Sequence, residues 1–196
     1  MGSGLYSSTL RSSRATSMGY ATKSAGEIFT SRKISNDMDP RVVMLREARD
    51  SNDHPNSVPI IIGLDVTASM GSIPHQLVRT GLPTMMDSII KEGTPDPQVL
   101  FIGIGDHECD RSPLQVGQFE SNDELLDKWL TDTYLEGGGG GNDGESYHLA
   151  WFFADRYTEL DSSEKRGEKG FLFTIGDEPV LKTLPASAQR SIMGAG

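Results

Sequence analysis

The chain contains the segment Pro59-Ile-Ile-Ile-Gly-Leu-Asp65-Val-Thr67-Ala-Ser69-Met-Gly71, an apolar run that ends in one carboxylate and two hydroxyls. An unbroken apolar run of this length is typical of a strand buried on both faces. Asp65, Thr67 and Ser69 are spaced by two, so in an extended chain their side chains lie on the same side. Carboxylate and hydroxyl oxygens are hard ligands that suit Mg²⁺, Mn²⁺ or Ca²⁺. The segment therefore predicts a divalent-cation site at the end of a strand.

The rest of the chain alternates apolar runs with helical patterns, which predicts an α/β fold. The predicted strands are 58–64, 98–105 and 169–175, with an edge strand at 114–119, and the predicted helices are 73–91, 123–131, 146–157 and 184–193. Buried strands that alternate with helices are typical of a parallel sheet covered on both faces. We therefore expect a doubly wound, mostly parallel, Rossmann-like central sheet with helices on both faces.

The domain organisation follows from a change in composition near residue 57. Residues 1–26 are rich in Ser, Thr and Gly, and we expect a flexible basic arm there because little apolar surface is available to offset the entropy of ordering. In residues 27–57 we expect a short strand at 27–34, a helix at 41–49 and a polar linker. Residues 58–196 are the predicted compact domain.

Charge and cysteine content exclude several classes of function. Residues 1–50 hold 8 Lys or Arg against 5 Asp or Glu, whereas the remainder holds 10 against 23. An acidic body repels nucleic acid phosphates, so we expect no nucleic acid binding by the domain. Cys109 is the only cysteine, which rules out an internal disulfide. No apolar run reaches the roughly 18 residues of a membrane helix, and no secretory signal is recognisable, so we expect a cytoplasmic location.

Other oxygen-bearing side chains follow the predicted strands. Asp106 follows the second apolar run and Asp177 follows the third, while a glycine-rich loop ends in Asn142, Asp143 and Glu145. In open α/β sheets, ligands bind at the carboxyl ends of the strands. We therefore expect these groups to meet at one edge of the sheet.

These residues resemble the von Willebrand factor type A domains, which carry a metal-ion-dependent adhesion site. Asp65-Val-Thr67-Ala-Ser69 is similar to the family's Asp-x-Ser-x-Ser motif, with Thr in the middle place. Thr174-Ile-Gly-Asp177 is similar to Ile-Thr-Asp-Gly, with the Gly before the acid. Gly-Gly-Asn142-Asp143-Gly144-Glu145 resembles the integrin β-subunit variant Asp-x-Pro-Glu, with Gly in place of Pro. The resemblance covers residues 58–180.

The resemblance implies a set of metal ligands and a kind of partner. The implied ligands are Asp65, Thr67, Ser69, Glu145 and Asp177, and the alternative ligands or holders of a metal-bound water are Asp106, Asn142 and Asp143. The implied cofactor is Mg²⁺, with Mn²⁺ or Ca²⁺ as alternatives. The implied partner is a protein that offers an Asp or Glu side chain to the ion. Intracellular relatives act as adaptors in multi-subunit assemblies, some of them beside AAA+ ATPases.

Two other functions compete with a binding module. One is a structural subunit of a large assembly, for example a viral one, which uses the N-terminal arm. The other is a Mg²⁺-dependent phosphohydrolase of the haloacid-dehalogenase type, whose Asp-x-Asp-x-Thr motif uses the second acid in acid/base catalysis. Thr67 stands in that second place, so we expect a module that is not an enzyme.

The C-terminal part is short for the family. A domain of this kind has about six strands, two of which follow the last metal loop, whereas 19 residues follow Asp177. We therefore expect a sheet that is incomplete on its C-terminal side, one to which residues 27–34 contribute a strand, or one whose exposed edge pairs with another chain. Edge pairing predicts a homo-oligomer.

Overall fold

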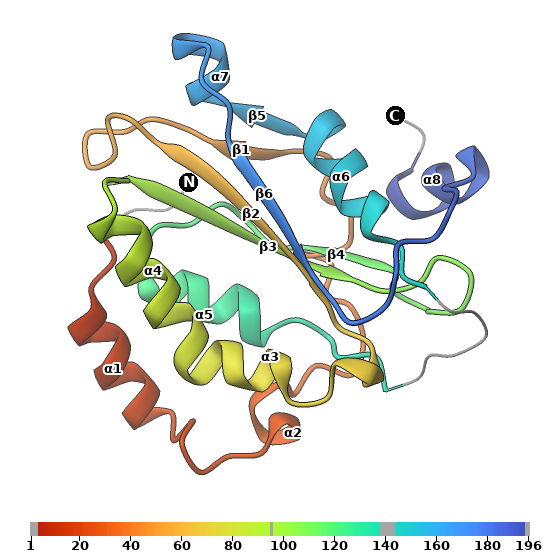
Figure 1. The fold of residues 1–196 in the computed structure, drawn as a ribbon, viewed down its shortest axis with the longest axis horizontal. Helices are drawn as coiled ribbons and strands as arrows, with labels where there is room; N and C mark the ends of the chain where they lie inside the picture. Colours follow the sequence, from red (N-terminus) through yellow and green to blue (C-terminus); the bar gives the residue numbers. More distant parts are fainter. Residues whose placement is uncertain (1–3, 95, 138–143, 195–196) are drawn as a thin grey trace.

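A computed structural model describes residues 4–94, 96–137 and 144–194. Its centre is a four-stranded sheet in the order β4-β3-β2-β6 (Figure 1). The strands are β2 (Val58–Asp65), β3 (Pro97–Ile104), β4 (Leu114–Val116) and β6 (Phe171–Ile175). β3 and β6 both run parallel to β2, and β4 runs antiparallel to β3. β1 (Arg46–Ala48) and β5 (Thr158–Leu160) form a separate parallel pair.

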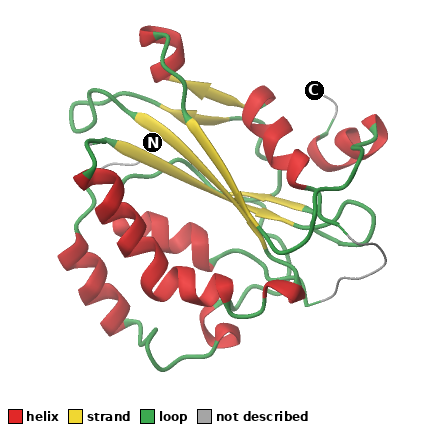
Figure 2. Cartoon of the chain, in the orientation of Figure 1, coloured by secondary structure: helices red, strands yellow, loops and turns green. Residues whose placement is uncertain are grey.

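Helices cover both faces of the central sheet (Figure 2). One side carries α1 (Ser8–Ser17), α2 (Ala25–Ile28), α3 (Ile73–Gln76), α4 (Leu82–Lys91) and α5 (Asp123–Thr131). The other carries α6 (Tyr147–Arg156) and α8 (Ala186–Met193), with α7 (Asp161–Arg166) beside β5. Alternate residues of β2 supply the two cores: Ile60 and Ile62 belong to the cluster on the α4 side, and Ile61 to the cluster on the α6 side. The predicted doubly wound, mostly parallel α/β fold is confirmed.

The predicted helix over 73–91 is interrupted. A π-helical turn, η2 (Leu77–Gly81), separates α3 from α4. Pro83 lies in the first turn of α4. Proline has no amide hydrogen and its ring clashes with the preceding turn of an α-helix, so the chain widens locally before it continues. Leu82 and Met86 remain fully buried, because the wider turn keeps them facing the sheet.

Two predictions for residues 27–57 are wrong. Residues 25–28 form the short helix α2 in place of the start of a strand at 27–34, and residues 46–48 form strand β1 inside the predicted helix 41–49. The Asp39 carboxylate accepts a hydrogen bond from the Arg41 amide at 2.9 Å and also pairs with the Arg41 guanidinium, which favours a turn over a helix start. β1 exists because it pairs with β5, more than a hundred residues later.

The N-terminal segment, predicted as a flexible arm, packs against the domain through helix α1. The Arg11 side chain is completely buried and forms an ion pair with Asp127 of α5. Arg11 Nη2 also donates to the carbonyl of Val78 at 2.5 Å. The Tyr20 hydroxyl donates to the same Asp127 carboxylate at 2.6 Å. Arg11 therefore holds the polar N-terminal segment against the domain, because its guanidinium pairs with the buried Asp127 carboxylate of α5.

Replacing this arginine should destabilise the whole fold. We expect Arg11→Ala to lower the free energy of unfolding by about 3–5 kcal/mol, because Asp127 would stay buried without its charge partner. Arg14→Ala is the matched control, since the Arg14 side chain is 28% exposed and contacts the same carboxylate from its rim. Urea denaturation measures both. Equal midpoints for Arg11→Ala and the wild type would contradict the packing of α1.

A second ion-pair network ties β1 to α7. Arg49 Nη1 donates to Asp161 Oδ1 at 3.0 Å, and Lys165 Nζ donates to Asp161 Oδ2 at 2.5 Å. The Asp50 amide donates to the same carboxylate at 2.9 Å. The hydrogen bond from Lys165 is the largest of the effects that lower the pKa of Asp161 to about 2. This carboxylate therefore favours the folded state only while it is ionised.

Stability should fall in acid through this group. The unfolded pKa of an aspartate is about 3.9, so the contribution of Asp161 is fully present above that pH and is lost as pH falls toward 2. Asp161→Asn should be less stable than the wild type at neutral pH, and the difference should shrink as pH falls through this window. Thermal melts at a series of pH values measure it. A difference that is independent of pH would refute this assignment.

Candidate metal centre

The end of β2 holds a connected row of oxygen atoms. Asp65 is the last residue of β2 and is fully buried. Its Oδ1 accepts hydrogen bonds from the Thr67 amide at 2.9 Å and from the Thr67 hydroxyl at 2.7 Å. The Thr67 and Ser69 hydroxyl oxygens lie 2.9 Å apart, and Ser69 Oγ donates to Asp177 Oδ1 at 3.0 Å. Four of the predicted ligands are therefore in contact, although Asp177 is more than a hundred residues from Asp65.

The local backbone explains why these side chains converge. Thr67 is extended, with φ −74° and ψ 167°, and it caps the short 3-10 helix η1 (Ala68–Met70). The extended residue keeps the alternation of side chains begun in β2, so Asp65 and Thr67 point the same way. Gly71 then takes a φ of +53°, a conformation that side chains disfavour, and turns the chain toward α3. The segment thus presents its oxygens and leaves the sheet within a few residues.

Glu145 is held beside the loop that follows β6. Its amide donates to the carbonyl of Pro179 at 2.9 Å, and the Leu181 amide donates to its carbonyl at 3.0 Å. The Glu145 residue is 6% exposed. Nearby, the Tyr147 hydroxyl donates to the carbonyl of Glu178 at 3.1 Å. These contacts attach the start of α6 to the Asp177 loop, so that Glu145 and Asp177 keep a defined relation.

Several carboxylate oxygens in this region lack a partner. Asp65 Oδ2, Asp106 Oδ2 and Glu145 Oε2 are buried and have no hydrogen-bond partner among the described residues. Burial raises the pKa of Glu145 to about 8, and the negative charge of Asp65 adds to the rise. Burial also raises the pKa of Asp65 against the opposing effect of the Thr67 hydrogen bonds, and the Asp177 charge raises it further. Burial thus disfavours the ionised forms of these carboxyl groups, and a bound cation would stabilise those forms.

The hydrogen-bond row also contains too few protons. Thr67 and Ser69 supply one hydroxyl proton each, but three close oxygen contacts join Asp65, Thr67, Ser69 and Asp177. When both carboxylates are ionised and each hydroxyl donates to its carboxylate, no proton remains between Thr67 and Ser69. The three contacts, at 2.7, 2.9 and 3.0 Å, are also close to the roughly 2.9 Å that separates neighbouring ligands around an octahedral Mg²⁺ at about 2.0–2.1 Å. The residues present therefore fit a small divalent cation.

Carboxylates alone do not make such a site. In the part of the chain that the structure describes, no group of three or more His, Cys, Asp or Glu side chains is arranged to hold a metal ion. A cation at this position would draw on the two hydroxyls and on water as well as on carboxylates. That donor set is one that hard cations accept and zinc does not favour.

Asp106 follows β3 and mainly orders its own loop. Its Oδ1 accepts from the Glu108 amide at 2.9 Å, and its amide donates to Asp110 Oδ2 at 2.8 Å. The sequence places Asp110 at the same strand end as Asp106 but outside the predicted ligand set, and in the structure its pKa is raised by burial and by the charge of Glu136. The position of Asp110, four residues after Asp106, was the feature of the sequence that could have indicated this contact. The other two predicted alternatives, Asn142 and Asp143, lie outside the described residues.

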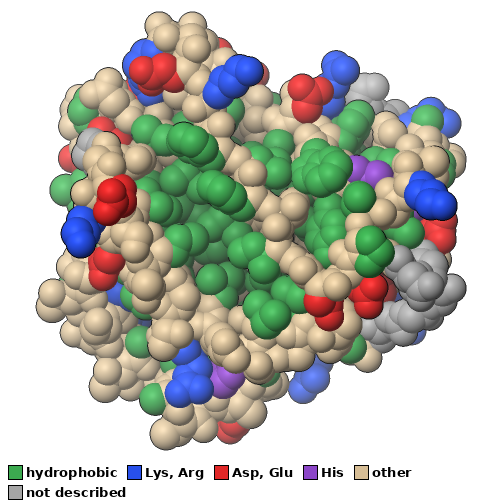
Figure 3. Space-filling view, viewed as in Figure 1, with side chains coloured by type: hydrophobic (Ala, Val, Ile, Leu, Met, Phe, Trp, Pro, Cys, Tyr) green, Lys and Arg blue, Asp and Glu red, His purple; other side chains and the backbone are tan. Residues whose placement is uncertain are grey.

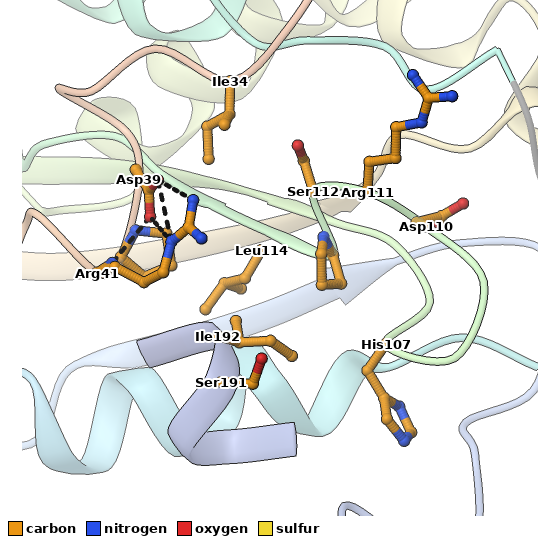
Figure 4. A pocket seen from close by; sticks show the side chains of 12 residues that line it. Ile34, Asp39, Arg41, His107, Asp110, Arg111, Ser112, Leu114, Ser191 and Ile192 are labelled. Atoms are coloured by element: carbon orange, nitrogen blue, oxygen red, sulfur yellow. Dashed lines mark hydrogen bonds and ion pairs between the residues drawn. The ribbon is translucent and has the colours of Figure 1, made fainter. Parts of the chain in front are cut away.

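A cavity of about 180 Å³ adjoins this loop on the side away from β6. Ile34, Leu114 and Ile192 project into it from three different segments (Figure 4). Asp39 and Arg41 pair with each other at its wall. Asp110 and Arg111 also line the cavity, so its wall carries charges of both signs, unlike the candidate metal centre.

We compared the sequence with protein-family models and with curated proteins. No protein-family model matches the sequence, and no curated protein matches it. The resemblance to von Willebrand factor type A domains therefore stays a prediction that rests on the motifs themselves. Within the described residues, no helix has both the length and the apolar character needed to cross a membrane.

The glycine before Asp177 provides a test of the site's construction. A Cβ atom on Gly176 would lie 1.8 Å from the Tyr147 hydroxyl oxygen. Gly176→Ala should therefore displace the Asp177 loop and lower the free energy of unfolding by about 1–3 kcal/mol. Gly137→Ala is the control, since a Cβ there meets no atom within 4 Å. Chemical denaturation compares the two, and equal stabilities would contradict the close approach of Tyr147 to this loop.

Proposed function

We propose that this chain is a von Willebrand factor type A-like protein-interaction module that binds one divalent cation at the candidate metal centre. Asp65, Thr67, Ser69, Glu145 and Asp177 hold the ion directly or through water, and Mg²⁺ is the preferred ion, ahead of Mn²⁺ and Ca²⁺. A partner protein completes the coordination with an Asp or Glu side chain. The row of three close oxygen contacts with only two hydroxyl protons carries this proposal.

The proposed ligands of the site have different roles. Asp65 is buried and supplies charge at the base, while Thr67 and Ser69 are aligned by the backbone before any ion arrives. A pre-aligned donor set loses little entropy on binding, which favours affinity. Glu145, with one unpartnered buried oxygen, comes from a different segment, which leads into α6.

The exposed side of the site is where a partner would approach. Ser69 and Asp177 are both exposed, whereas Asp65 and Glu145 are buried. A bound cation would supply Lewis acidity and positive charge at this opening. Two of the five proposed ligands are neutral hydroxyls, so the protein does not saturate the ion with charge and an incoming carboxylate remains attractive. Such an opening favours a protein partner with an acidic side chain, of the kind found in multi-subunit assemblies or beside AAA+ ATPases.

The phosphohydrolase alternative finds less support in the same geometry. Thr67 stands where that mechanism needs a second carboxylic acid, and its hydroxyl is already committed to Asp65 Oδ1 at 2.7 Å. A general acid must hold a proton that it can release near neutral pH, which a threonine hydroxyl does not do. A binding role uses the same hydroxyl without requiring that step.

Cation binding should stabilise the folded protein. We expect Mg²⁺ to raise the melting temperature of the wild type and to give a titratable heat in calorimetry, because a ligand that binds only the folded state stabilises it by about 2.7 kcal/mol at a hundredfold excess over its Kd. Asp65→Asn should abolish both effects. The variant should still fold, since it replaces a buried and incompletely partnered carboxylate with a neutral group of the same shape.

Asp155→Asn is the matched control, because its side chain is 70% exposed on α6 and pairs only with Arg156 among the ion pairs of the described residues. It should bind Mg²⁺ like the wild type. Undiminished Mg²⁺ affinity in Asp65→Asn would overturn the assignment of the site. Mg²⁺-dependent hydrolysis of p-nitrophenyl phosphate that disappears in Asp65→Asn would replace the interaction module with the hydrolase.

A further inference from the structure

Strand β6 forms one edge of the central sheet and exposes large apolar side chains there. Phe171, Phe173 and Ile175 are 53%, 55% and 39% exposed, and they alternate along the strand. Because alternate residues lie on the same side of a strand, these three form one row on the α4 side of the sheet. Figure 3 shows hydrophobic side chains gathered on this face of the molecule.

The row borders a hollow in the surface. Ile60 and Ile89 form its floor together with Phe171 and Phe173, and its volume is about 330 Å³. The edge of a sheet offers backbone donors and acceptors to another strand, and natural proteins protect such edges with charges, prolines or bulges. β6 carries none of these devices along Phe171–Ile175. An apolar row on an unprotected edge is therefore a surface suited to strand pairing.

We propose that a second copy of this chain pairs with β6 in antiparallel orientation, so that the two central sheets join into one across a two-fold axis. The axis passes through Phe173. In this register Phe173 faces its own counterpart and Phe171 of each copy lies opposite Ile175 of the other. The two apolar rows then lie side by side on one face of the joined sheet and form three cross-strand apolar pairs. Dimer formation requires no bound cation, although Asp177 belongs both to the candidate metal centre and to the end of β6.

The charges at the two ends of β6 favour this orientation. Lys169 precedes the strand, whereas Asp177 and Glu178 follow it, and all three are exposed. Glu168 also precedes the strand, but it is paired with Arg166 at 3.0 Å. A parallel pair of copies would bring the two acidic ends together. The antiparallel pair places each Lys169 opposite the acidic end of the other strand, and the two-fold axis makes this contact twice. An unrelated strand gains no such match, which is why a second copy is the favoured occupant.

Self-association tests the proposal directly. Sedimentation equilibrium over a range of concentrations should show a monomer–dimer equilibrium for the full chain. We expect Phe173→Lys to raise the dimer dissociation constant by about a hundredfold or more, because the axis would bring two charges together in place of two rings. Leu10→Lys is the control, since Leu10 is 59% exposed but lies on α1, away from β6. It should dimerise like the wild type.

A disulfide test reads the register. In a Cys109→Ser background, Phe173→Cys places two thiols directly opposite each other, at a separation that a disulfide can span. We expect a covalent dimer on oxidation. Thr174→Cys in the same background is offset by two residues from its counterpart, which separates the Cα atoms by more than about 7 Å, and should not cross-link.

Three outcomes would overturn the proposal. One is a monomer at every concentration, as expected if an unrelated strand or a further segment of a longer chain covers β6. Another is a dimer that Leu10→Lys and Phe173→Lys weaken equally, which would place the interface elsewhere. The third is cross-linking of Thr174→Cys but not of Phe173→Cys, which would exclude the antiparallel register.

Discussion

Asp65 closes a central strand with its carboxylate out of contact with water, and one of its two oxygens has no hydrogen-bond partner among the described residues. A buried carboxylate in this state is costly unless it is neutralised or paired. The surrounding elements reflect that constraint. η1 presents the Thr67 amide and hydroxyl to Oδ1, and the loop after β6 brings Asp177 to the same row of oxygens. The geometry that positions these groups is the parallel sheet itself, which carries its strand ends to one side.

The same strand serves both of the proposed surfaces. β6 carries Asp177 at its carboxyl end and the row of Phe171, Phe173 and Ile175 along its length. Its register against β2 places Ile175 beside Leu64, one residue before Asp65. Any shift of β6 along β2 would therefore move Asp177 away from Ser69 and would alter the exposed apolar row. The packing of Tyr147 over Gly176 opposes such a shift from the other face of the sheet.

Buried charge also organises the far side of the molecule. Arg11, Tyr20 and Asp127 join helix α1 to α5 through one carboxylate, and Arg11 reaches across to the Val78 carbonyl beside η2. The N-terminal segment thereby covers the α4 and α5 side, while Arg49 forms ion pairs with Glu47 of β1 and Glu159 of β5. Charged side chains in this protein act in small groups that connect distant segments, and polar composition by itself says little about which segments are ordered.

The sequence by itself determined the central strands, the helices at 123–131 and 146–157, and the cluster of oxygen-bearing side chains after Leu64. These features depend on the periodicity of apolar residues and on the spacing of polar residues at strand ends, which are properties of neighbouring residues. The same sequence patterns wrongly predicted a strand at 27–34 and a helix at 41–49, and they predicted a flexible arm where the structure has α1. Only the tertiary structure decided β1 and the packing of α1, since β1 depends on β5 and Arg11 depends on Asp127, and both partners lie about a hundred residues away. Helix α2 is different, because it begins with a capping box between Ser24 and Glu27, which is a local signal. The contact between Ser69 and Asp177 was predictable from the parallel topology. The attachment of Glu145 to residues 179–181 was not predictable. It consists of backbone hydrogen bonds between two loops, and the spacing of residues in the sequence does not indicate such bonds.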